Sequence, residues 1–235
     1  KIPETLRRRA HPSLTEAGPA PRFRLSEHTT LLWMTLAAVP VSLLYSQVEI
    51  VLPLHLKSRF DDFLTVFATL ITINGSLVVT CQLLIARGAE RFLAHRVILV
   101  AYVCFAIVGV GYGWAPSFLF LVATEAVFTL GEMLFGPQIQ KAVSMLAAPE
   151  YRARYFAIFG LNHGLMRTLG PPVGALAFDL VGGPAWFSGI GILVAVAAVF
   201  QVRCVRKAAA VAAEERRPSE PRSESTRRAV TPVTS

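Results

Sequence analysis

Residues 117–140 read SFLFLVATEAVFTLGEMLFGPQIQ, and this stretch decides the fold class. It carries two charged residues, Glu125 and Glu132, in an otherwise apolar run. The run is long enough for a helix to cross a bilayer, which takes about 20 residues. A membrane-spanning strand needs only about 10 residues and alternates apolar with polar side chains, which this run does not do. The stretch therefore predicts a transmembrane helix.

Comparable apolar runs lie on both sides of this stretch. Hydrophobic residues make up 54% of the chain and charged residues 16%, and the mean hydropathy is +0.52. A soluble domain carries about 25% charged residues. We therefore predict an all-α membrane protein in which six transmembrane helices form one bundle over residues 31–206. The other five predicted spans are 31–54, 63–85, 97–114, 155–181 and 186–205.

The two ends of the chain differ from the apolar middle. Residues 1–30 are polar and rich in proline and arginine, which is typical of a solvated linker, here a cytoplasmic loop. Residues 207–235 contain few large apolar side chains, so we expect a disordered cytoplasmic tail. The sequence opens on Lys1 and not on Met, from which we expect a piece of a longer protein.

Lysine and arginine are distributed very unevenly. If six helices alternate in direction, 20 of the 23 lysines and arginines fall on one side of the membrane, and only Lys57 and Arg59 fall on the other. Positive residues concentrate on the cytoplasmic side of membrane proteins. The pattern predicts a multi-pass protein of the cell (inner or plasma) membrane with both termini in the cytoplasm. It also accounts for the net charge of +8 without a nucleic-acid partner.

The sequence gives no sign of enzyme chemistry. Cys81, Cys104 and Cys204 share no short spacing, so they predict neither a zinc site nor a disulfide framework. No GxSxG, HExxH or Walker A motif occurs. We expect no enzyme, no cofactor and no metal site.

Polar residues inside the spans are the best candidates for function, because a bilayer makes them costly. In the 31–54 helix, Ser42, Tyr45, Ser46 and Glu49 recur at helical spacing and share one face. This face predicts a contact with protein or with a water-filled cavity. The alternative is that Glu49, near the outer end, simply reaches interfacial water. In the 63–85 helix, Asn74 either packs against a neighbouring helix or contacts a ligand.

The 117–140 helix places Glu125, Thr129 and Glu132 on one face. Two carboxyl groups there require either that one is protonated or that each has a cationic partner. Counting helical rise puts Arg167 of the 155–181 helix level with Glu125, and His163 near the level of Glu132. Such a set predicts substrate binding or proton relay, and the alternative is a static pair that locks two helices. If Arg167 pairs with Glu125, then Glu125→Gln destabilises the protein.

A second pattern in the 155–181 helix concerns packing. Small residues allow close helix approach, and a double proline bends a helix. The predicted packing and bending residues are Gly160, Gly164, Gly170, Pro171, Pro172 and Gly174.

Five short motifs follow one another along the chain. They are YSQ at 45–47, ARGAER at 86–91, TLGEML at 129–134, APEYRARY at 148–155 and GLNHGLMRTLGPPVG at 160–174. Their order and spacing resemble the C-terminal half of the major facilitator superfamily, especially its drug:proton antiporter branch. The resemblance covers roughly residues 1–206, with Ala153 in place of a glycine usual in that family.

The resemblance implies a fold and a function. The six helices would be helices seven to twelve of the family, built as two inverted three-helix repeats that work by alternating access with an N-terminal six-helix half. Glu90, Arg91, Arg152 and Arg154 would form a cytoplasmic gating network. The partners would be a small-molecule substrate, protons, the bilayer and the missing half, with a proton gradient as the energy source. Proton-coupled efflux of lipophilic or drug-like solutes is the leading expectation. Uptake of a small organic solute and a non-transporting interaction or assembly fragment are the alternatives.

The predicted topology is testable with single cysteines introduced into a variant that lacks Cys81, Cys104 and Cys204. A membrane-impermeant thiol reagent added outside cells should label position 58 and leave positions 90 and 153 unlabelled, because of the charge asymmetry. Labelling from outside at 90 or 153, with none at 58, would contradict the topology.

Overall fold

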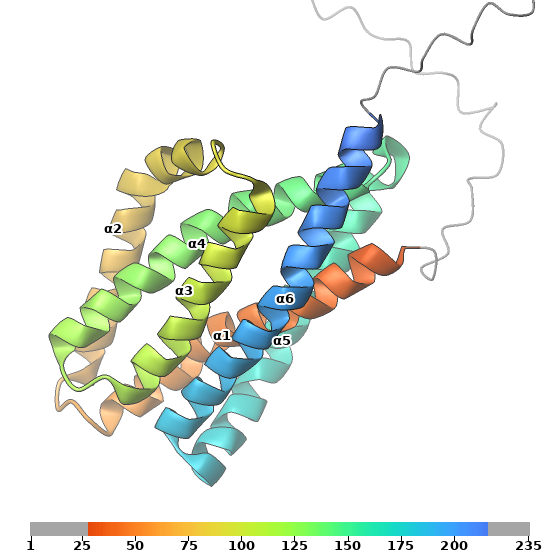
Figure 1. Cartoon of the computed structure of the whole chain (residues 1–235). Coiled ribbons are helices and arrows are strands. Elements are labelled where there is room, and N and C mark those ends of the chain that lie inside the picture. Colours follow the sequence, from red (N-terminus) through yellow and green to blue (C-terminus); the bar gives the residue numbers. More distant parts are fainter. Residues whose placement is uncertain (1–27, 216–235) are drawn as a thin grey trace, which may run out of the picture.

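A computed structural model describes residues 28–215, and every regular element in this part of the chain is helical (Figure 1). The six long helices, which match the predicted number and order, are α1 (Thr29–Lys57), α2 (Phe63–Ala89), α3 (Ala94–Trp114), α4 (Phe118–Leu146), α5 (Arg152–Val181) and α6 (Gly183–Glu215). A 3₁₀ turn, η2 (Pro149–Tyr151), precedes α5. The all-α prediction is confirmed.

The helices in the structure are longer than the membrane spans predicted from the sequence. Within residues 28–215, five helices are long and apolar enough to cross a membrane. The remaining long helix, α5, contains Asn162, His163, Arg167 and Asp179, which lower its hydropathy. The predicted tail was wrong at its start, because α6 continues through residues 207–215. That segment is rich in alanine and glutamate, which are strong helix formers. The rest of the predicted tail and almost all of the predicted linker lie outside the described residues.

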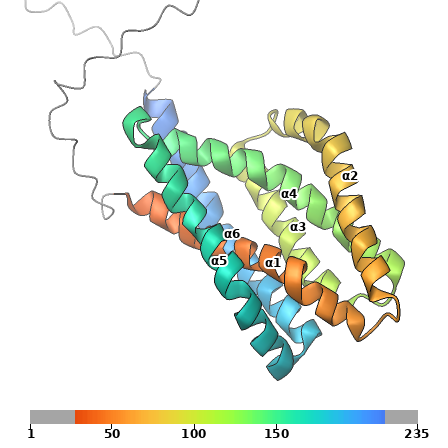
Figure 2. The same ribbon diagram turned by 180° about the vertical axis from the view of Figure 1, so that it is seen from behind.

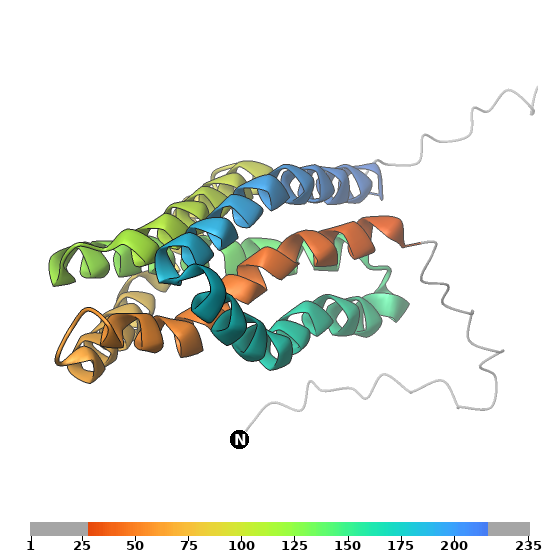
Figure 3. The same ribbon diagram turned by 90° about the horizontal axis from the view of Figure 1, so that it is seen from below.

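The helix packing repeats itself with the two halves exchanged. Helices α1 to α3 form one three-helix unit and α4 to α6 form the other. The first helix of each unit packs against the second and third helices of the other unit: α1 packs against α5 and α6, and α4 packs against α2 and α3. The contact between α3 and α6 maps onto itself under this exchange. Figure 2 shows α2 and α5 on opposite sides of the bundle, and Figure 3 shows α3 and α6 together on one side with α5 on the other. This pattern is that of two inverted three-helix repeats.

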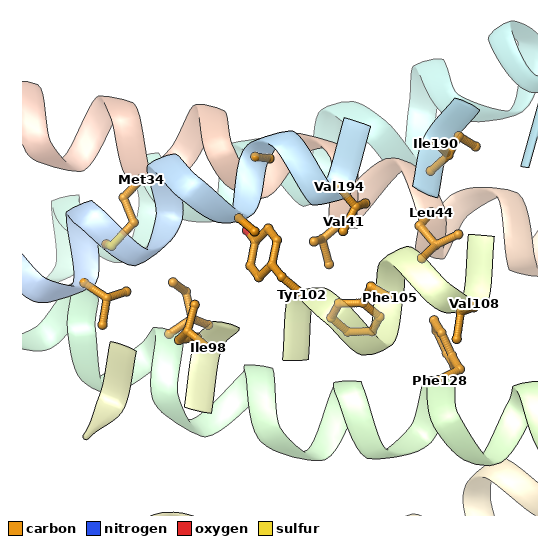
Figure 4. Close-up of a cluster of buried hydrophobic side chains, with 14 of the residues drawn as sticks. Met34, Val41, Leu44, Ile98, Tyr102, Phe105, Val108, Phe128, Ile190 and Val194 are labelled. Atoms are coloured by element: carbon orange, nitrogen blue, oxygen red, sulfur yellow. The ribbon is translucent and has the colours of Figure 1, made fainter. Parts of the chain in front are cut away.

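Small residues bring α3 and α6 into contact. A side chain at Gly109 would lie 2.7 Å from the Cα of Gly191, so neither position tolerates one without backbone movement. Around this crossing, apolar side chains from α1, α3, α4 and α6 form the core (Figure 4). Tyr102 and Phe105 of α3 are completely buried at its centre.

A hydrogen-bonded amide organises the contact between α1 and α5. Gln47 is completely buried, its Nε2 donates to the Gly170 carbonyl at 3.0 Å, and its Oε1 accepts from the Trp186 indole at 3.1 Å. A Cβ at Gly170 would collide with Ser46, and one at Gly174 would collide with Gln47. This side of α5 therefore has no room for larger residues.

The other two glycines of α5 do not make the predicted helix contact. An added Cβ at Gly160 or Gly164 would meet no atom within 4 Å. Gly160 instead lines a cavity between α1, α4 and α5, which is why no helix lies against it. Pro171 and Pro172 lie inside α5, and the α5 ribbon changes direction along its length (Figure 3). A proline cannot donate the backbone hydrogen bond of a continuous helix.

Alanine substitutions separate the two kinds of glycine. Gly174→Ala should lower the free energy of unfolding in detergent by about 1–3 kcal/mol, because the methyl group overpacks the contact with Gln47. Gly164→Ala, in the same helix, should be neutral or stabilise by up to about 1 kcal/mol through helix propensity. Equal destabilisation by both substitutions would contradict the α1–α5 packing.

Candidate functional site

The polar face of α4 lies inside the bundle. Ser117 caps the start of α4 by accepting from the Phe120 N–H, which fixes where the helix begins. Further along α4, the side chains of Glu125 and Thr129 face the interior of the bundle, and these residues are 3% and 0% exposed. The Tyr112 hydroxyl of α3 donates to Glu125 Oε2 at 2.5 Å. The carboxyl group of Glu125 is therefore satisfied by a neutral donor.

Asn74 of α2 connects the rest of this face to a second helix. Its Nδ2 donates both to Thr129 Oγ1 and to Glu132 Oε2, each at 3.0 Å. The Thr129 hydroxyl in turn donates to the Glu125 backbone carbonyl at 2.8 Å. Glu125, Thr129 and Glu132 thus belong to one polar network that includes a residue of α2.

Aromatic rings stand beside this network. The Tyr45 ring lies 5.1 Å from that of Phe128 and 5.8 Å from that of Phe105, measured between centroids. Phe128 also lies 6.4 Å from Tyr112. Such tilted and edge-on contacts stabilise packed rings and fix their orientation. The aromatic cluster is therefore a rigid wall next to the carboxyl groups.

A cavity of about 210 Å³ opens among α1, α2 and α4. It brings together five of the predicted pathway residues, to which Thr129 is joined through Asn74. Apolar side chains complete its wall, among them Phe67, Leu70 and Ile71. The five predicted residues that line this carboxyl cavity are Tyr45, Glu49, Asn74, Glu125 and Glu132.

Arg167 does not have the predicted partner. Its guanidinium lies 3.7 Å from Glu49 Oε2, whereas Glu125 is bonded to Tyr112. Helical rise predicts the depth of Arg167 along the helix, but it says nothing of the direction in which a side chain leaves the helix. The side chains of Arg167 and Glu49 are 66% and 51% exposed. If water reaches them, such a pair contributes about 0–1 kcal/mol.

His163 lies in a different cavity from Glu132. A cavity of about 570 Å³ among α1, α4 and α5 is lined by His163, Asn162, Ser42 and Tyr45. The Ser42 hydroxyl and the Asn162 side chain are hydrogen-bonded across α1 and α5. Tyr45 lines both this cavity and the carboxyl cavity, so it stands between His163 and the carboxyl groups.

The arrangement matches a known transporter family. The sequence profile of the Major Facilitator Superfamily matches residues 32–235. The chain belongs to the Major Facilitator Superfamily. It is 28% identical over 192 residues to the uncharacterized MFS-type transporter YhjO of Bacillus subtilis (strain 168), covering 82% of this chain and 47% of YhjO. It is 25% identical over 197 residues to the uncharacterized MFS-type transporter YdeE of Escherichia coli (strain K12), covering 82% of this chain and 49% of YdeE. The chain therefore spans about half the length of these relatives.

The charged residues assigned to a gating network lie at one end of this Major Facilitator Superfamily bundle. Glu90 caps α2 and Arg91 follows it, and both are exposed. Arg152 and Arg154 begin α5 at the same end (Figure 1), and the Arg154 guanidinium lies 5.8 Å from the Tyr151 ring centroid. Within residues 28–215, no ion pair joins Glu90 to either arginine. The gating role stays a prediction.

Several buried polar residues at helix contacts are not predicted from the sequence. Tyr112, which donates to Glu125, lies in an apolar glycine-rich helix, and its only signal in the sequence was its hydroxyl group, one of two in that helix. Gln47 and Asn162 were part of quoted motifs but had no role assigned. His55 is 3% exposed, its Nε2 lies 3.2 Å from the Gly113 carbonyl, and the Phe178 and Phe187 rings flank it. These residues connect helices, and their roles become evident only from the residues that they contact in the structure.

The bond between Tyr112 and Glu125 can be measured by a double-mutant cycle. Tyr112→Phe and Glu125→Leu should each lower the free energy of unfolding by about 1–3 kcal/mol, because each leaves a buried polar group without its partner. The double variant should cost less than the two single variants together.

Glu125→Gln is the control, since it keeps an acceptor for the tyrosine and should have a small effect. Additive single costs, or a collapse of stability in Glu125→Gln, would favour Arg167 and not Tyr112 as the partner of Glu125.

Proposed function

We propose that this chain is the C-terminal half of a secondary active transporter that works by alternating access. The proposal is supported by family membership, by the two inverted repeats, and by the match to about half of each relative. Both termini then lie in the cytoplasm of a cell whose inner or plasma membrane holds the protein. The partner in transport is an N-terminal six-helix half.

The carboxyl cavity is the observation that carries a proton-coupled mechanism. Three carboxyl groups line it, and Glu49 already pairs with Arg167. The other two have different surroundings. Glu125 is buried and bonded to a tyrosine hydroxyl, whereas Glu132 is half-buried, lines the cavity and accepts from the neutral amide of Asn74. Among residues 28–215, no ion pair joins Glu125 or Glu132 to a cation, since Arg167 pairs with Glu49. Glu132 is therefore the better proton carrier.

The wall of the cavity fits a lipophilic solute. Tyr45, Phe67 and Phe128 present aromatic surface, and a few polar groups stand among them. A binding site of this kind is mostly apolar with a small number of placed polar groups. We therefore propose efflux of small lipophilic or drug-like solutes in exchange for protons, with Glu90, Arg91, Arg152 and Arg154 biasing the cytoplasmic gate.

Substitution of Glu132 tests the coupling. In the complete transporter, reconstituted in vesicles, Glu132→Gln should abolish solute transport driven by a proton gradient, because the amide cannot carry a proton. Solute counterflow without a gradient should remain near the wild-type rate, since the amide can still accept from Asn74.

Asp179→Asn is the matched control, because it removes an exposed carboxyl of α5 outside the cavity and should leave both activities unchanged. Normal proton-driven flux in Glu132→Gln would contradict the proton assignment. Proton-driven accumulation in the opposite direction would instead favour uptake, and no flux in any wild-type assay would favour a non-transporting role.

A further inference from the structure

A groove on the outer surface of the bundle combines an apolar floor with a cationic end. It lies between α3 and α6 and has a volume of about 460 Å³. These two helices run side by side on the face opposite α5 (Figure 3). Val103 and Ile107 of α3 and Val199 of α6 line it and are 47–56% exposed. In a membrane-spanning bundle this face lies against lipid. The groove is therefore open to acyl chains.

Two arginines close the groove at one end. Arg203 and Arg206 of α6 line it, both are exposed, and none of the described residues that line it is acidic. Within residues 28–215, no ion pair involves either arginine. The hydroxyl of Tyr102, which also lines the groove, already donates to the Ala37 carbonyl at 2.9 Å. The guanidinium groups are thus the polar donors available to a ligand.

The length of the groove along α6 corresponds to the thickness of one leaflet of a bilayer. From Ala195 to Arg206 along α6, helical rise gives about 16 Å. Half of the hydrocarbon core of a bilayer is about 15 Å. The arginines lie at the end of the bundle that the charge pattern predicts to be cytoplasmic, where phosphate groups of the inner leaflet lie.

We propose that this groove binds one anionic phospholipid, with an acyl chain along α3 and α6 and the phosphate at Arg203 and Arg206. Charge complementarity selects the headgroup, since basic pockets between transmembrane helices bind anionic lipids. A second groove, between α1 and α6, serves as an internal comparison. Trp33, Leu36 and Phe200 line it, and none of its described lining residues is charged. The proposal is independent of the transported solute.

Lipid exchange on the purified protein, followed by native mass spectrometry with phosphatidylglycerol and phosphatidylcholine as probes, tests the proposal. Wild-type protein should retain phosphatidylglycerol in preference to phosphatidylcholine. The double variant Arg203→Gln/Arg206→Gln should bind phosphatidylglycerol about thirtyfold more weakly. The double variant Arg87→Gln/Lys141→Gln loses the same charge away from the groove and should stay within about twofold of wild type.

A second pair of variants tests the groove itself. Ala195→Trp fills it without changing charge and should release the phospholipid, whereas Val196→Trp, on the neighbouring groove, should not. Equal losses in both charge variants, or in both tryptophan variants, would overturn the proposal. Displacement of phosphatidylglycerol by excess inorganic phosphate would overturn it as well, since it would show that the arginines bind phosphate without the acyl chain.

Discussion

A polar group buried among apolar helices must find a partner inside the protein, and this constraint shapes the bundle. The backbone N–H and C=O groups of a helix form hydrogen bonds with one another. Buried polar side chains therefore form theirs with residues of neighbouring helices. Gln47 reaches α5 and α6, Asn74 reaches α4, and Tyr112 joins α3 to α4. Among residues 28–215, the exception is Gln201, whose buried amide has no hydrogen-bond partner.

The same bonds that connect helices also build the proposed site. Asn74 joins α2 to α4 through Thr129 and Glu132, and the carboxyl cavity lies beside this junction. At the contact between α1 and α5, Gln47, Gly170 and Gly174 have a packing role. The inverted repeats therefore share a packing pattern, whereas ionisable groups gather in the cavity formed with α2 and α4.

Periodicity and charge predicted the number of helices, their order and the inward polar face of α4. These features follow from constraints that act along one helix. The partner of Arg167 was predicted wrongly, because sequence gives the depth of a residue and not the rotation of its helix toward a neighbour. Gly160 and Gly164 look in sequence like Gly170 and Gly174, and only the position of α1 distinguishes them. The helical extension over 207–215 was missed because its composition suits both a helix and a solvated tail.

The central claim is that Glu132 carries the proton that solute binding displaces. It is tested most directly by the pH change when solute is added to the purified complete transporter in weakly buffered detergent solution. The account predicts that wild-type protein releases protons on binding, and that Glu132→Gln binds solute without releasing them. Undiminished proton release by Glu132→Gln, with solute binding retained, would contradict it.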